Sequence, residues 1–134
     1  MKRAVIFVLF LFFMNGISAV AYSSAATGNW NTATTWSPNG IPGNGDSVTI
    51  NSGNTITVSD SRTIGTGSAT SITNNGVLTV SGSLILNGDI AMNANSVFNM
   101  NPGSSLTMNS FNVLSTGKTT FNFVGTSGSR ITVV

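Results

Sequence analysis

The side chains able to do acid–base chemistry are few and widely spaced in this sequence. The carboxylates are Asp46, Asp60 and Asp89, and the 134 residues include no Glu, His or Cys. Without Cys or His there is no disulfide, thiol nucleophile, imidazole base or zinc site of the usual kind. Glycoside hydrolysis needs two carboxylates facing each other across the scissile bond. The gaps of 14 and 29 residues between these carboxylates do not match the coil of about 23 residues that the strand spacing predicts, so the three side chains are not expected on one face. We therefore expect no enzyme, catalytic residue, metal site or cofactor.

The cations of the chain are concentrated at its start. Lys2 and Arg3 precede an apolar run over residues 4–14, and the small residues Ala19-Val20-Ala21 follow it. A positive start, a short apolar segment and an Ala-x-Ala end are typical of a secretory signal peptide. The run is shorter than the roughly 20 residues that cross a bilayer. Residues 1–21 are therefore predicted to be a helical signal peptide cleaved after Ala21, with Ala25 as the alternative site. The protein is expected to be secreted or held at the cell surface.

Removal of that leader changes the charge. The formal charge of +2 falls to zero, because Arg62, Lys118 and Arg130 balance the three Asp residues. Three separated cations do not form the clustered basic surface that phosphates require. Nucleic acid is therefore excluded as a partner, and no membrane span is expected in the mature chain.

Apolar residues after position 47 recur in pairs two residues apart. Period two is the signature of strands with one buried face. The pairs are Val48/Ile50, Ile56/Val58, Leu78/Val80, Leu84/Leu86, Ile90/Met92, Phe98/Met100, Leu106/Met108, Phe111/Val113, Phe121/Phe123 and Ile131/Val133, with Ile64 and Ile72 as single positions. Gly, Ser, Thr and Asn make up about half of the chain, and Asn-Gly and Ser-Gly steps separate the pairs. Such residues favour tight turns, so an all-β fold is predicted.

Two all-β architectures fit these short strands. Asn-Gly turns could join antiparallel hairpins into a sandwich. Alternatively, three strands could form one coil of about 23 residues, with successive coils stacked in parallel. The brevity of the strands and the absence of a long crossover favour a right-handed parallel β-helix of about four coils over residues 48–134. A shared core is then predicted for Ile50, Val58, Val80, Leu86, Met92, Met100 and Met108.

The two ends of this solenoid differ in sequence. Residues 22–47 hold Trp30, Trp36 and two prolines without strand alternation, which predicts an N-terminal cap. The last residues, 130–134, keep the period of a strand, and nothing comparable to a cap follows. An open terminal coil exposes unpaired backbone groups. We therefore expect a solenoid truncated at its C-terminus, or end-to-end or edge association with another chain.

The motifs around the cap resemble a known family. They are Asn29-Trp30, Thr35-Trp36, Gly40-Ile41-Pro42-Gly43, Gly45-Asp46, Val48-Thr49-Ile50 and Thr55-Ile56-Thr57-Val58. This run of about 30 residues resembles the eight-glycine extracellular domain and related N-terminal segments of β-helical bacterial surface proteins. The resemblance implies export, a β-rich fold and membership of a large surface or matrix protein. The larger catalytic or repeat region of such proteins is not present in this sequence, so the resemblance implies no enzymatic activity for it.

The expected function follows from these features. We interpret the chain as a secreted, non-catalytic structural or adhesive β-solenoid segment of a larger cell-surface or extracellular protein. The alternative is a carbohydrate-binding module of a polysaccharide-acting protein, with Trp30 and Trp36 as the candidate sugar platform. Burial of both Trp residues in a cap is their plainer interpretation. The expected partners are an extracellular polysaccharide or other surface proteins.

Two further features have limited functional meaning in the sequence. Asp46 lies in a Gly-rich turn, where a contact with nearby main-chain N–H groups is its expected role. Five asparagines, Asn93, Asn95, Asn99, Asn101 and Asn109, are predicted to line corners and to hydrogen-bond between coils. Ice binding is not expected, because Thr55 and Thr57 form the single Thr-x-Thr pair on a predicted strand.

Overall fold

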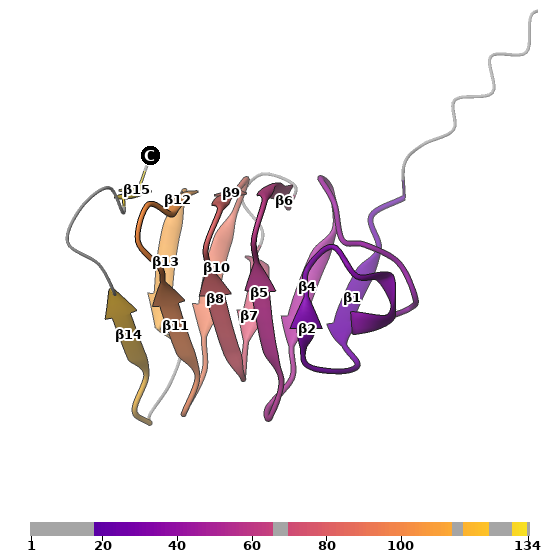
Figure 1. Ribbon diagram of the computed structural model, residues 1–134, viewed down its shortest axis with the longest axis horizontal. Coiled ribbons are helices and arrows are strands. Elements are labelled where there is room, and N and C mark those ends of the chain that lie inside the picture. The colour runs from indigo at the N-terminus through magenta and orange to yellow at the C-terminus, as the bar shows by residue number, and fades with distance from the viewer. Residues whose placement is uncertain (1–17, 66–69, 114–116, 124–129, 134) are drawn as a thin grey trace, which may run out of the picture.

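The computed structural model describes residues 18–65, 70–113, 117–123 and 130–133. Their backbone forms fifteen short strands and a single-turn 3₁₀-helix, η1 (Ala33–Thr35). The strands wind into a β-solenoid of about four turns, and each turn adds one strand to each of three sheets (Figure 1). The predicted all-β solenoid is therefore confirmed. Residues 1–17 of the predicted signal peptide lie outside the described residues.

Each sheet runs along the solenoid. The first sheet contains, in spatial order, β13 (Ser110–Val113), β10 (Asp89–Met92), β7 (Thr70–Asn74), β4 (Ser47–Ile50), β1 (Ala21–Ser24) and β3 (Trp36–Ser37). The second contains β14 (Thr120–Phe123), β11 (Val97–Met100), β8 (Val77–Val80), β5 (Thr55–Val58) and β2 (Gly28–Asn29). The third contains β15 (Arg130–Val133), β12 (Ser105–Met108), β9 (Ser83–Leu86) and β6 (Ser61–Ile64).

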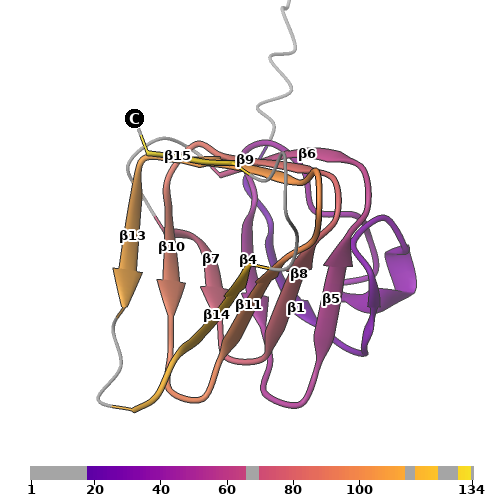
Figure 2. The same cartoon turned by 60° about the vertical axis from the view of Figure 1, so that its left-hand side comes forward.

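Strand pairing decides between the two predicted architectures. Every ladder among strands β4 to β15 is parallel, as in the pairing of β5 with β8 and of β8 with β11. The one antiparallel pair among the described strands joins β1 to β3 in the cap. A sandwich of hairpins would pair neighbouring strands antiparallel, so that alternative is excluded. Figure 2 shows the three sheets arranged around a common interior.

The interior is built from the apolar pairs of the sequence. All twelve predicted strand positions fall on strands β4 to β15. The seven residues predicted to share a core are all buried and belong to one apolar cluster. In-register pairing stacks Ile56 on Leu78 and Leu78 on Phe98. Complete burial of one such side chain contributes about 1.5–3 kcal/mol.

Two inward positions depart from the apolar pattern. Arg62 occupies the place in β6 that Leu84 occupies in β9. Asn74, fully buried in β7, donates from Nδ2 to the main-chain oxygen of Val97 at 2.9 Å. Its Oδ1 accepts from the main-chain N–H of Gly76 at 3.1 Å, which pairs both ends of the amide. Buried polar groups are tolerated when they are paired in this way.

The corners bring successive coils into close contact. Asn93 hydrogen-bonds to Asn75, and Asn101 to Ser81, each across one coil. These two corner contacts confirm the prediction of side-chain bonds between coils. Asn99 is a correction, because it lies within strand β11 and not at a corner. Asn95 has φ 64°, the left-handed conformation that Asn adopts more readily than most residues.

The N-terminal cap contains more regular structure than its sequence suggests. Strand β1 begins at Ala21, the last residue of the predicted leader, and pairs in parallel with β4. Strands β2 and β3 have two residues each, too few for an alternating pattern to be visible in the sequence. The chain of the cap is thus fixed onto the first coil by main-chain pairing.

Candidate functional site

The outward surface of the second sheet presents two straight columns of side chains, which we call the ladder face. Parallel pairing in register aligns the strands β2, β5, β8, β11 and β14. The residues that point outward alternate with the buried ones. One column is Asn29, Thr57, Thr79, Asn99 and Asn122, and the other is Thr55, Val77, Val97 and Thr120. All nine are half-buried or exposed.

Hydrogen bonds between coils link three of the five residues in the first column. The Nδ2 atom of Asn99 donates to Oγ1 of Thr79 at 3.2 Å, and Nδ2 of Asn122 donates to Oδ1 of Asn99 at 2.8 Å. Neighbouring strands of a sheet lie about 4.7–4.9 Å apart. The amides and hydroxyls therefore repeat at a fixed interval along the solenoid axis. Such an array offers donors and acceptors to a partner without having to be ordered first.

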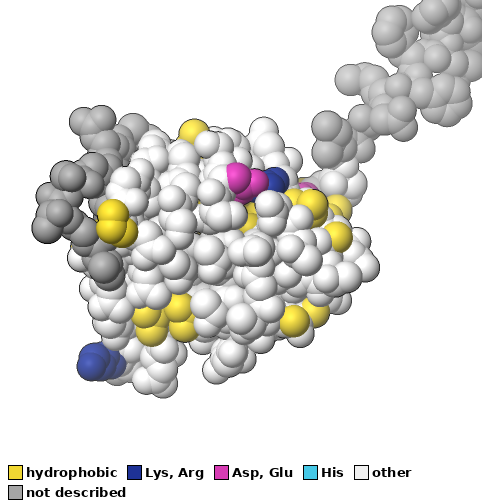
Figure 3. Space-filling view, in the orientation of Figure 1, with side chains coloured by type: hydrophobic (Ala, Val, Ile, Leu, Met, Phe, Trp, Pro, Cys, Tyr) yellow, Lys and Arg dark blue, Asp and Glu magenta, His cyan; other side chains and the backbone are white. Residues whose placement is uncertain are grey.

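The ladder face carries no ionisable side chain. In Figure 3, which views the molecule from the side of β5, β8 and β11, the area over these strands is polar with a small apolar patch. Lys118 is exposed and precedes β14 instead of pointing from it. The methyl groups of Val77 and Val97 supply apolar surface beside the polar column. This chemistry suits an uncharged polar partner.

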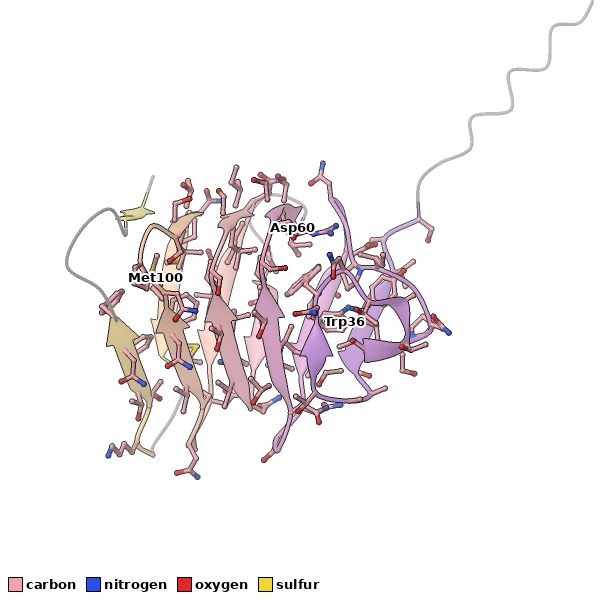
Figure 4. The ribbon with its side chains drawn as sticks, viewed as in Figure 1. Trp36, Asp60 and Met100 are labelled. Atoms are coloured by element: carbon pink, nitrogen blue, oxygen red, sulfur yellow. The ribbon has the colours of Figure 1, made fainter. Side chains whose placement is uncertain are left out.

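The two Trp residues lie inside the cap. Trp30 is fully buried and Trp36 is 2% exposed. The indole Nε1 of Trp30 donates to the main-chain oxygen of Pro42 at 3.1 Å, and that of Trp36 to the oxygen of Trp30 at 2.8 Å. Figure 4 shows Trp36 within the cap, at the opposite end of the solenoid from Met100. The sugar platform predicted at Trp30 and Trp36 is therefore corrected, since neither ring has an exposed face.

Asp46 is held at a turn, as expected from its sequence position. Its Oδ2 accepts from the main-chain N–H of Gly43 at 2.8 Å. Its Oδ1 accepts from the main-chain N–H of Val20 at 2.9 Å, a contact with the other side of the cap. The second contact has no signal in the local sequence, because the two residues are 26 positions apart.

Asp60 and Arg62 form an ion pair above the third sheet. The carboxylate receives hydrogen bonds from both Nε and Nη2 of Arg62, the first at 2.9 Å. The hydrogen bond from Arg62 holds the pKa of Asp60 below its usual value. Arg62 occupies an inward position of β6, and its guanidinium is paired with the carboxylate of Asp60, whose side chain is 40% exposed. The role of the pair is thus structural, at the end of an apolar column.

Groups suited to metal binding do not gather in the part of the chain that the structure describes, where no three His, Cys, Asp or Glu residues come together. Over those same residues, no helix has the length and apolar character to cross a membrane.

Fold and surface together define the chain as a parallel β-solenoid with a capped N-terminal end and an uncharged ladder face. The chain belongs to a family described as a domain of unknown function, DUF8693, whose profile matches residues 21–127. No curated protein and no solved structure matches the chain. The family description gives no activity, and the resemblance to the eight-glycine extracellular domain stays a prediction.

Proposed function

We propose that the chain is an exported, non-catalytic structural and adhesive β-solenoid segment of a larger cell-surface or extracellular protein. The observation that carries this proposal is the ladder face, an ordered polar surface without charge. Hydrogen bonds between coils restrain the side chains of Thr79, Asn99 and Asn122, so this part of the face loses less side-chain entropy when it binds a partner. The ladder face is the surface that we assign to adhesion.

The engagement of the carboxylates supports a non-catalytic role. Asp60 is paired with Arg62, and Asp46 accepts two main-chain N–H groups. Asp89 starts strand β10 in the first sheet, opposite Thr70 of β7 and Ser110 of β13. A general acid or base needs a carboxyl within hydrogen-bond reach of the reacting group. In Asp46 and Asp60, the carboxylate oxygens that would have to reach a reacting group are bonded to the protein itself.

Adhesion can be tested with a charge placed on the ladder face. We would display the chain on a bacterial surface and measure attachment to glass, polystyrene and polysaccharide-coated plates. Thr79→Lys adds a long cation at the centre of the polar column, and Thr107→Lys adds the same group to the outward side of β12 in the third sheet. The expected result is loss of attachment for Thr79→Lys alone. Equal attachment by both variants, with both folded by circular dichroism, would refute the role of this face.

Carbohydrate binding is the second candidate function, and the ladder face also favours it. Hydroxyls, amides and methyl groups without charge are the groups that contact a neutral sugar polymer. The binding surface is then the ladder face and not the buried Trp pair. Affinity electrophoresis in gels containing neutral glycans or anionic alginate would test this. Retardation by a neutral glycan that Thr79→Lys abolishes and Thr107→Lys preserves is the expected outcome. Retardation by alginate alone, or by no glycan, would rule it out.

A further inference from the structure

Residues just before β1 take part in the folded structure although they lie within the predicted leader. The main-chain oxygen of Val20 accepts from the N–H of Ser47 at 3.1 Å, and Ala21 pairs with Ser47 in the ladder between β1 and β4. The N–H of Val20 donates to Asp46 Oδ1 at 2.9 Å. Val20 is half-buried, whereas Ala19 before it is exposed. The folded unit therefore begins at Val20.

The predicted cleavage sites would remove parts of this unit. A cut after Ala21 deletes both main-chain bonds of Val20 and the pairing of Ala21. A cut after Ala25 deletes the whole of β1, including the buried Ser24. The Oγ atom of Ser24 accepts from the N–H of Asn51 and from Nδ2 of Asn54, both at 2.8 Å. A cut after Ala19 leaves all of these contacts in place.

We propose that signal peptidase cleaves between Ala19 and Val20, and that the new α-ammonium group of Val20 forms an ion pair with Asp46. The inference rests on the export that we propose for the chain. Cleavage is a hydrolysis: the hydroxyl of water adds to the carbonyl carbon of Ala19, and the amine of Val20 leaves with the proton. At neutral pH the new carboxyl group of Ala19 releases a proton and the amine of Val20 takes one up, which makes it an ammonium. Ala19 supplies the small residue directly before the bond, and Ile17 stands at the third position before it, where an Ala-x-Ala site has Ala. Asp46 is thereby a positioning residue for the mature N-terminus.

Charge supports this assignment. The single salt bridge among the described residues joins Asp60 to Arg62, so the described contacts give Asp46 main-chain donors and no cation. The main-chain N–H of Val20 donates to the carboxylate of Asp46, and an ammonium at that nitrogen would add the attraction between two opposite full charges to this hydrogen bond. Asp46 is the one titratable side chain that lines the surrounding pocket.

The first experiment determines the cleavage site. The full chain is expressed with its leader in a secreting bacterium, and the exported product is analysed by intact mass and N-terminal sequencing. The expected sequence is Val-Ala-Tyr, beginning at Val20. An exported product that begins at Tyr22 or Ala26 would overturn the inference and leave the proposed export intact. An uncut chain retained in the cytoplasm would overturn both.

The second experiment tests the ion pair without depending on export. Chains that begin at Val20, with a free or an acetylated amine, are made with and without Asp46→Asn, and Tm is measured from pH 6 to pH 9. The free α-amine has a reference pKa of about 7.7–8.0, and a carboxylate neighbour raises it in the folded state. The stabilisation is therefore present below that reference value and is lost as pH rises through the folded pKa.

The acetylated chain is the matched control, because it keeps the N–H donor and has no charge. At pH 6 the free-amine chain should melt roughly 4 °C above the acetylated one. At pH 9 this difference should be smaller, and Asp46→Asn should remove it at every pH. A difference that survives Asp46→Asn, or that does not change with pH, would overturn the ion pair.

Discussion

The indole N–H of Trp36 donates a hydrogen bond of 2.8 Å to the main-chain oxygen of Trp30, and the two rings pack edge to face with their centroids 4.8 Å apart. Trp30 in turn donates to Pro42. The cap is therefore closed by a chain of two hydrogen bonds that runs from one Trp to the other and on to the loop before β4. Both indoles need a polar partner inside the protein, and each has one.

Replacing Trp36 with Phe should weaken the cap. The substitution keeps an aromatic ring but leaves the buried oxygen of Trp30 without its indole donor, which costs about 2 kcal/mol of unfolding free energy. Chemical denaturation in urea measures this change. Ile41→Ala, at a side chain that is 43% exposed, is the control and should change stability by less than about 0.5 kcal/mol. Equal effects of the two variants would contradict the closure of the cap by Trp36.

Gly76 should not tolerate a side chain. A Cβ atom there would lie 2.5 Å from the main-chain oxygens of Asn51 and Asn54, which belong to the preceding corner. Gly76→Ala should therefore destabilise the fold by about 3 kcal/mol, because backbone of the stacked coil must move. Gly53 has φ +85° and nothing within 4 Å of its Cβ position. Gly53→Asn should cost less than about 1 kcal/mol, since Asn accepts this conformation. Thermal unfolding of both variants compares the two corners, and similar losses would argue against the close approach.

The buried amide of Asn74 should be more important than an exposed amide of the ladder face. Asn74→Leu would leave the oxygen of Val97 and the N–H of Gly76 without their side-chain partner, at a cost of about 2–3 kcal/mol. Asn122→Ser, at an exposed position, should cost less than about 0.5 kcal/mol. Hydrogen exchange at the amide of Gly76 would give a local measure. Unchanged protection in Asn74→Leu would show that this bond is not needed.

The stability of the fold should depend on pH through the ionisation of Asp60. The pKa of this carboxyl is lowered by its hydrogen bond to Arg62, so the pair stabilises the fold above the ordinary pKa of 3.8. The contribution is lost as pH falls through the lowered value in the folded state. Asp60 is 40% exposed, and solvent screening keeps the effect below about 1 kcal/mol. Asp60→Asn should reduce Tm slightly at pH 6, and this reduction should become smaller as pH falls toward 2. A larger loss at pH 2 would contradict this sign.

Much of the fold can be derived from the sequence because the signal is local. A pair such as Ile56 and Val58 is two residues apart, and period two by itself places both on the buried face of a strand. The turn residues between the pairs then limit each strand to four or five residues, as observed in β4 to β15. The strands of the cap leave little signal in the sequence, because the two-residue strands β2 and β3 are defined by the strands they pair with and not by an alternating pattern of their own.

Two inward positions show where the local pattern fails. Arg62 and Asn74 are polar, and the alternation of their own strands does not explain how they are accommodated. The fold brings the main-chain oxygen of Val97 to Asn74, from which it is 23 residues distant in the sequence. Asp60 is close to Arg62 in the sequence, but only the fold shows that this pair lies at the open end of an apolar column. Burying such groups is acceptable only because these partners exist.

The sequence by itself determined the period-two strands, their turns and the neutral charge of the chain after residue 21, and it favoured the solenoid over the sandwich. Tertiary structure decided which outward residues stand in one column. From one coil to the next the same position recurs after 18 residues between Ile72 and Ile90 and after 26 between Tyr22 and Val48. With such variable coils, no fixed spacing in the sequence aligns Thr57, Thr79 and Asn99. Main-chain hydrogen bonding sets that register, and it thereby builds the ladder face from residues that have no common motif.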